Sequence, residues 1–64
     1  MKIYEVKFYC NNYKMLVACD DYRESSGVHC FINGDYPNDY PIFQPSVNDC
    51  SVKFIEEVVE NNAE

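Results

Sequence analysis

The sequence predicts a mainly β protein, a small antiparallel sheet or half-open barrel built on an N-terminal hairpin. Three observations support this class: apolar residues alternate with polar ones through much of residues 3–20, the pair Asn11-Asn12 interrupts that alternation at its middle, and Asn33-Gly34 supplies a second turn signal. The chain has 64 residues, which is enough for one domain, 1–64, with a thin core. Its hydrophobic content of 47% argues for folding rather than disorder.

The N-terminal hairpin is expected to turn at Asn11 and Asn12, because asparagine tolerates the positive φ that tight hairpins require. A two-residue turn at this point sets the register of both strands, and it places eight apolar or amphipathic side chains on one face. The expected pairs are Cys10 with Tyr13, Phe8 with Met15, Val6 with Val17 and Tyr4 with Cys19.

The segment after the hairpin divides into a loop and a short strand. Residues 20–27 are polar and end in glycine, which predicts a loop. Residues 28–32 are apolar on both faces of a strand, with Val28, Cys30 and Ile32 on one face and His29 and Phe31 on the other. A strand of this kind is usually covered on both sides, so we expect a central position in a sheet or a place at a dimer seam.

A second hairpin is expected at Asn33-Gly34. The returning segment contains the repeat Asp35-Tyr36-Pro37 and Asp39-Tyr40-Pro41. Proline cannot donate a ladder hydrogen bond, so only residues 40–44 are expected to form a strand, at a sheet edge. Tyrosine is favoured at protein interfaces, which makes the repeat a candidate binding loop; the alternative is a surface loop whose tyrosines fold back onto the sheet.

The last segment fits two structures. A helical stripe that starts at Val47 is apolar at five of six positions, namely Val47, Cys50, Ser51, Phe54, Ile55 and Val58, of which only Ser51 is polar. The many β-branched residues weaken a helix, however, and 52–59 also fits a closing strand. The alternative fold class is therefore α+β, with three or four strands followed by a C-terminal helix at about 46–61.

The net charge is −6, from eleven acidic and five basic residues. This balance argues against direct binding to nucleic acid and against adsorption to an anionic membrane, because both need cations on phosphates. A protein with a basic surface is the favoured partner. No stretch has the pattern of a signal peptide or the length of a membrane span, so the cytoplasm is the expected location and reduced cysteines are expected there.

The residues that could carry chemistry do not form a recognisable catalytic or metal motif. The nearest two of the four cysteines, Cys10 and Cys19, are nine positions apart, and the expected hairpin separates them by roughly 20 Å, unlike the close pairs of structural zinc sites. Neighbours in a strand point to opposite faces, so His29 cannot activate Cys30. We therefore expect no enzyme, no cofactor and no metal, with buried free thiols; a small zinc-binding module is the alternative.

The order of segments resembles that of very short, acidic, β-rich proteins encoded by phages and prophages. The resemblance covers most of the chain and rests on Tyr4–Phe8, Ala18–Tyr22, a short aromatic strand, Pro41–Pro45 and Val52–Val58. Many such proteins inhibit host enzymes or antiviral defence, and they include anti-CRISPR proteins. The resemblance implies an inhibitor that acts in the cytosol of the host cell.

The functional prediction combines these points. We expect a non-enzymatic inhibitor that binds a basic surface of a host or defence protein, in one version by imitating nucleic-acid phosphates with Glu56, Glu57, Glu60 and Glu64 on a C-terminal helix. A self-associating structural or assembly protein, with a possible homodimer, is the alternative. The expected partner-binding residues are Asp20, Asp21, Glu24, Asp35, Tyr36, Asp39 and Tyr40.

Overall fold

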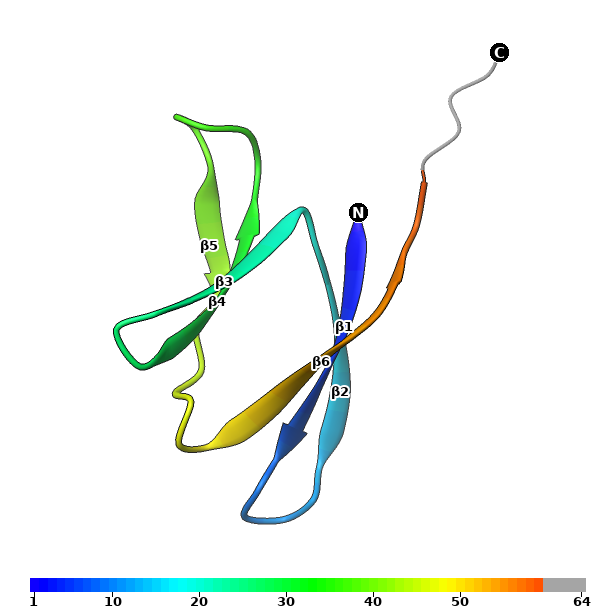
Figure 1. The fold of residues 1–64 in the computed structure, drawn as a ribbon, viewed down its shortest axis with the longest axis vertical. Coiled ribbons are helices and arrows are strands. Elements are labelled where there is room, and N and C mark those ends of the chain that lie inside the picture. Colours follow the sequence, from blue (N-terminus) through cyan, green and yellow to red (C-terminus); the bar gives the residue numbers. More distant parts are fainter. Residues whose placement is uncertain (60–64) are drawn as a thin grey trace.

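A computed structural model describes residues 1–59. Within this range the chain forms six strands and no helix (Figure 1). They make two antiparallel three-stranded sheets, sheet A with the order β2-β1-β6 and sheet B with the order β3-β4-β5. The predicted mainly β class is confirmed, and the alternative C-terminal helix is wrong. The strands are β1 (Lys2–Phe8), β2 (Lys14–Cys19), β3 (Asp21–Ser25), β4 (Val28–Asn33), β5 (Tyr40–Phe43) and β6 (Cys50–Glu57).

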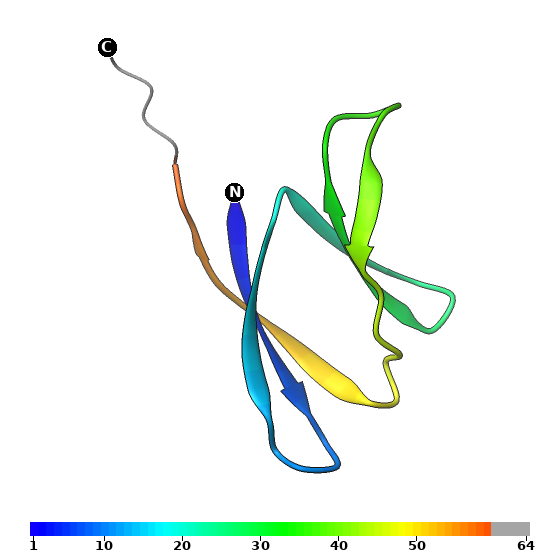
Figure 2. The same cartoon turned by 180° about the vertical axis from the view of Figure 1, so that it is seen from behind.

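The two sheets face each other and enclose a small core. Both are seen nearly edge-on in Figures 1 and 2, with sheet A on one side and sheet B on the other. Aromatic rings join them, because the Tyr4 ring of β1 lies 5.7 Å from the Phe31 ring of β4 and 5.0 Å from the Tyr22 ring of β3. The buried residues of this core are Tyr4, Val6, Val17, Cys19, Phe31 and Cys50.

The N-terminal hairpin forms, but its predicted register is wrong by two residues. Tyr4 lies opposite Val17 and Val6 lies opposite Met15. The strands are joined by the five residues 9–13 rather than by Asn11-Asn12 alone, and of these Asn12 has a positive φ of 58°. A shift of two residues leaves each side chain on the same face of its strand. The predicted apolar face therefore survives, apart from Cys10 and Tyr13, which are exposed.

The predicted loop at 20–27 is wrong, because most of it is strand β3. Tyr22 lies opposite Phe31 of β4 and packs into the core. Ser26 and Gly27 both have positive φ, 55° and 77°, and they form the tight two-residue turn that joins β3 to β4. The polar composition misled the prediction because only alternate residues of an edge strand face a core.

Strand β4 is central in sheet B, as predicted for residues 28–32. The tight turn predicted at Asn33-Gly34 is wrong, because the connection to β5 has six residues, 34–39. Both turn residues are engaged elsewhere: the Asn33 side-chain oxygen accepts a hydrogen bond from Asp20 N, and Gly34 N donates to the Asp20 carboxylate. The edge strand expected at 40–44 is confirmed as β5.

The closing segment is strand β6, which pairs with β1 through Val52 opposite Val6 and Phe54 opposite Tyr4. The register shifts between Ile3 and Tyr4, so the ladder contains a bulge at this point. The acidic helical face predicted for this segment does not form: Glu56 and Glu57 belong to a strand, and positions 60 and 64 lie outside the described residues. Among residues 1–59 there is no helix long and apolar enough to cross a membrane.

Candidate functional site

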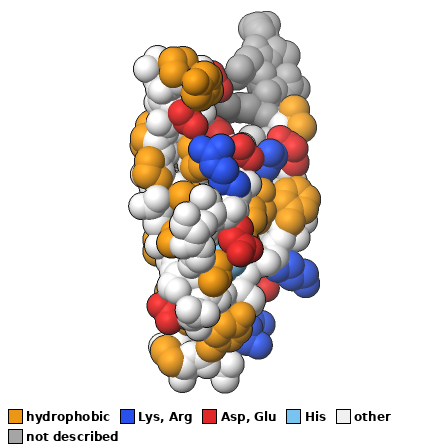
Figure 3. Space-filling model, turned by 60° about the vertical axis from the view of Figure 1, so that its left-hand side comes forward, with side chains coloured by type: hydrophobic (Ala, Val, Ile, Leu, Met, Phe, Trp, Pro, Cys, Tyr) orange, Lys and Arg blue, Asp and Glu red, His pale blue; other side chains and the backbone are white. Residues whose placement is uncertain are grey.

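An open groove of about 620 Å³ lies beside the 34–39 loop, on a face where Lys2 of β1 meets residues of sheet B. We call it the acidic groove. It brings together five of the seven predicted partner-binding residues, which come from two segments that are separate in the sequence. Its lining residues are Lys2, Asp20, Asp21, Arg23, Ile32, Gly34, Asp35, Tyr36 and Asp39. Figure 3 shows acidic and basic side chains mixed on the upper part of this face, with hydrophobic side chains next to them.

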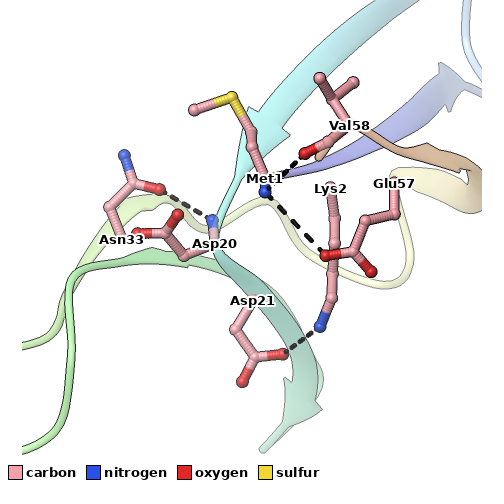
Figure 4. Close-up of polar contacts among 7 residues, drawn as sticks. All are labelled: Met1, Lys2, Asp20, Asp21, Asn33, Glu57 and Val58. Carbon is pink, nitrogen blue, oxygen red and sulfur yellow. Dashed lines mark hydrogen bonds and ion pairs between the residues drawn. The ribbon is translucent and has the colours of Figure 1, made fainter. Parts of the chain in front are cut away.

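Asp20 connects the two segments of the acidic groove. Its backbone N donates to Ile32 O at 3.0 Å and to the Asn33 side-chain oxygen at 3.0 Å. Its carboxylate Oδ2 accepts a hydrogen bond from Gly34 N at 2.8 Å. A carboxylate that accepts a backbone N–H makes a stronger hydrogen bond than a neutral acceptor. Asp20 thus holds the start of the 34–39 loop against the junction of β2 and β3 (Figure 4).

Two ion pairs span the acidic groove. Lys2 Nζ lies 3.6 Å from Asp21 Oδ1 (Figure 4), and Arg23 Nη2 lies 3.8 Å from Asp39 Oδ2. Such solvent-exposed pairs contribute only about 0–1 kcal/mol each to stability. Asp35 has no cationic group within 4.0 Å in the part of the chain that the structure describes. With four carboxylates and two cations, the groove carries a net charge of −2.

The tyrosines of the repeat differ in position. Tyr36, which follows Asp35 and precedes a cis peptide bond, is 88% exposed at the groove. Tyr40 is 55% exposed and lines a neighbouring hollow of about 250 Å³, which shares Arg23 and Asp39 with the acidic groove. The groove therefore has a free aromatic ring amid its carboxylates, which is a combination suited to contact with a protein surface.

Glu24 and Tyr40 are the two predicted site residues that do not line the groove, and Glu24 is the one that faces away from it. Glu24 lies opposite His29, on the same face of sheet B as Tyr22, whereas its neighbour Arg23 faces the groove. The alternation of a strand therefore places Glu24 on the other side of the sheet. The sequence also gave no signal for Lys2 and Arg23, because their contacts with the groove carboxylates cross between strands.

His29 is buried and occupies both of its ring nitrogens. Nε2 lies 3.2 Å from Cys50 O, and Nδ1 lies 2.7 Å from the Tyr22 hydroxyl. A carbonyl oxygen can only accept, so Nε2 carries the hydrogen and Nδ1 accepts from Tyr22 O–H. These hydrogen bonds tie β3 and β4 of sheet B to β6 of sheet A, which gives His29 a structural role.

The cysteines are all free thiols. Burial raises the pKa of the Cys19 and Cys50 thiols, which keeps both protonated and poorly nucleophilic. Within residues 1–59, no group of three or more His, Cys, Asp or Glu side chains is arranged to hold a metal ion. The geometry of the acidic groove is thus the main candidate for function. Comparisons with protein-family models, with curated proteins and with solved structures found no match to this chain.

Proposed function

We propose that this protein is a non-enzymatic inhibitor, of the kind found in phages, that binds a basic surface of a host or defence protein in the cytosol. The observation that carries the proposal is the convergence of Asp20, Asp21, Asp35 and Asp39 with the exposed ring of Tyr36 in one open groove. Two acidic segments meet there although about fifteen positions separate them in the sequence.

The chemistry of the groove suits a partner rich in arginine or lysine. Among the described residues neither Asp20 nor Asp35 has a cationic group within 4.0 Å, and the Asp20 carboxylate is engaged by Gly34 N. A guanidinium of the partner can therefore bind Asp35 without displacing an existing contact. Tyr36 supplies a large aromatic contact with few rotatable bonds to immobilise. Charge complementarity mainly raises the rate of association, so binding is expected to weaken as salt is added.

Affinity capture tests the proposal with a charge-reversal variant. Asp35→Lys combined with Asp39→Lys should abolish recovery of the partner that the wild-type protein captures from lysate of its host. Glu24→Lys combined with Asp49→Lys makes the same change of charge away from the groove and should leave recovery intact. Equal recovery of that partner by all three proteins would contradict a role for the groove.

A competition experiment tests whether inhibition works by nucleic-acid mimicry. If the captured partner binds nucleic acid through the same basic surface, a duplex added in excess should displace the wild-type protein in proportion to its occupancy of the partner. Simultaneous binding of the duplex and this protein would show that the groove covers a different surface.

A further inference from the structure

The outward face of sheet A carries the remaining basic side chains. In sheet A, side chains that do not face the core alternate with those that do, and Lys7, Lys14 and Lys53 all lie on the outward side. We call these three residues the lysine face. All three are exposed, and none has a carboxylate within 4.0 Å among residues 1–59. The other two side-chain cations, Lys2 and Arg23, are paired in the acidic groove.

The arrangement of the lysine face is electrostatically unfavourable in an isolated molecule. Lys7 lies directly opposite Lys14 in the β1–β2 ladder, and like charges placed opposite each other destabilise a sheet. Glu5 lies opposite Lys53, and Glu56 lies opposite Ile3 further along the same side of the sheet. A carboxylate-bearing surface that covers the lysine face would remove the repulsion.

We propose that a second copy of this chain provides that surface, so that the acidic groove of one molecule docks on the lysine face of the next. The two surfaces are complementary in charge, since the groove has a net charge of −2 and the lysine face has three cations beside Glu5, with Glu56 further along the same side of sheet A. Each also has a large exposed apolar side chain, Tyr36 in the groove and Leu16 on the lysine face, exposed by 88% and 67%. Burial of both would add apolar contact to the charge pairing.

The placement of the surfaces fixes the type of assembly. The groove is formed by the 34–39 loop, residues of sheet B and Lys2 at the start of β1, whereas the lysine face lies on the outward side of sheet A, so the two are different surfaces of the molecule. A contact between different surfaces of identical molecules is heterologous, and without ring closure it continues as an open stack. The proposal does not depend on the inhibitor function, because both surfaces belong to this chain.

Sedimentation velocity of the purified protein tests the proposal. At about 20 mM salt the weight-average mass should rise above the monomer value of 7.5 kDa as the concentration increases from about 10 µM to about 1 mM, and it should return to that value at about 500 mM salt. A monomer at every concentration in low salt would overturn the proposal.

Two neutralising variants separate the specific contact from the effect of net charge. The lysine-face variant, Lys7→Gln with Lys14→Gln and Lys53→Gln, and the groove variant, Asp35→Asn with Asp39→Asn, should both be monomeric. If net charge alone governed association, the groove variant should associate more strongly than the wild type, because its two substitutions reduce the net charge from −6 to −4. The control, Glu24→Gln with Asp49→Asn, has the same charge of −4 and should associate at least as strongly as the wild type.

Mixing the two variants provides the decisive observation. The groove variant retains an intact lysine face and the lysine-face variant retains an intact groove, so an equimolar mixture should form a dimer and stop at twice the monomer mass. Association that persists in either variant alone, or a mixture that stays monomeric, would overturn the proposal. Binding of a thymidine oligonucleotide to the lysine face of a wild-type protein that does not self-associate would also overturn it, in favour of a polyanion partner.

Discussion

At the scale of single residues, the most constrained side chain is His29. It is buried between the sheets, and both ring nitrogens have hydrogen-bond partners on other strands, Tyr22 on β3 and Cys50 on β6. Removal of the His29 ring would leave the Tyr22 hydroxyl and the Cys50 carbonyl oxygen without these hydrogen bonds. In a domain of this size, whose total stability is expected to be about 3–10 kcal/mol, one such loss matters.

We therefore expect His29→Ala to lower the free energy of unfolding by about 2–4 kcal/mol, through the cavity and the two lost hydrogen bonds. Tyr22→Phe removes only the hydroxyl partner and should cost about 1 kcal/mol. Urea unfolding followed by circular dichroism measures both values. Equal, small effects of the two substitutions would show that the His29 contacts do not stabilise the sandwich.

Two thiols and two tyrosine hydroxyls, buried or partly buried, make the free energy of unfolding sensitive to high pH. Burial raises the pKa of the Cys19 and Cys50 thiols and of the Tyr4 and Tyr22 hydroxyls. The unfolded chain therefore releases these protons at lower pH than the folded chain, and rising pH favours unfolding. The contribution of these groups to the free energy of unfolding is complete below about pH 8.5, which is the ordinary pKa of a cysteine thiol. The contribution declines above that pH, and it declines further near about pH 10, the ordinary pKa of tyrosine.

The measurement is the urea midpoint as a function of pH between about 7 and 11. The midpoint of the wild type should fall as the pH rises through this range. Cys19→Ala with Cys50→Ala lowers the midpoint at neutral pH because it leaves cavities, but between about pH 8 and 9.5 its decline should be shallower, because the thiols no longer contribute. Parallel curves for the two proteins would contradict the assignment.

At the scale of elements, the sequence predicted the face on which a side chain lies better than it predicted the residue that lies opposite on the next strand. The apolar face of β1 and β2 was predicted correctly although the register was not, because side chains alternate with a period of two and a two-residue shift preserves their direction. β3 was not predicted, because Tyr22 is the side chain that it contributes to the core and the residues around Tyr22 are polar. β6 was ambiguous because its apolar residues fit both periods, and its β-branched residues favour the strand that forms.

The candidate site was likewise predicted only in part. The residues that follow β2 and those that follow β4 meet because both strands end at the same end of the molecule, so five predicted residues share the groove. Glu24 was grouped with the other partner-binding residues because the segment was expected to be a loop, in which alternation does not apply. Lys2 and Arg23 enter the site through pairing between strands, which composition does not show.

The turn between β3 and β4 offers a test at this scale. Ser26 has a φ of 55° and is followed by Gly27 at 77°, which is the backbone that Asn-Gly prefers in a two-residue hairpin. Ser26→Asn should therefore raise the free energy of unfolding by roughly 0.5 kcal/mol, because asparagine tolerates the left-handed region better. Thermal unfolding measures the change, with Ser26→Val as the opposite control, and a stability gain from valine would contradict the turn geometry.

At the scale of the whole molecule, the fold depends on contact between the two ends of the described chain. β1 is paired on one side with β2 and on the other with β6, and Met1 N and Val58 O form a hydrogen bond of 3.2 Å. A domain this small has little core to spare. β6 supplies the buried Cys50 and the partly buried Val52 to that core.

A chain that ends at Asp49 should therefore fail to fold. Without β6 it loses both of those side chains, the carbonyl partner of His29 and the second hydrogen-bonding neighbour of β1. Far-ultraviolet circular dichroism and the dispersion of amide resonances should both indicate an unfolded chain at temperatures where the full chain is folded. A dispersed spectrum from the shortened chain would show that sheet B and the first hairpin are sufficient.

The exposed thiol of Cys10 offers a practical handle on the molecule. It lies in the 9–13 loop beyond the end of β1 that is remote from Lys2, about 25 Å from the groove at the rise of a strand. Of the other thiols, two are buried and that of Cys30 is half-buried. A maleimide fluorophore or a sensor-chip surface coupled there, in a Cys30→Ser background, would hold every molecule in one orientation with its carboxylates facing the solution.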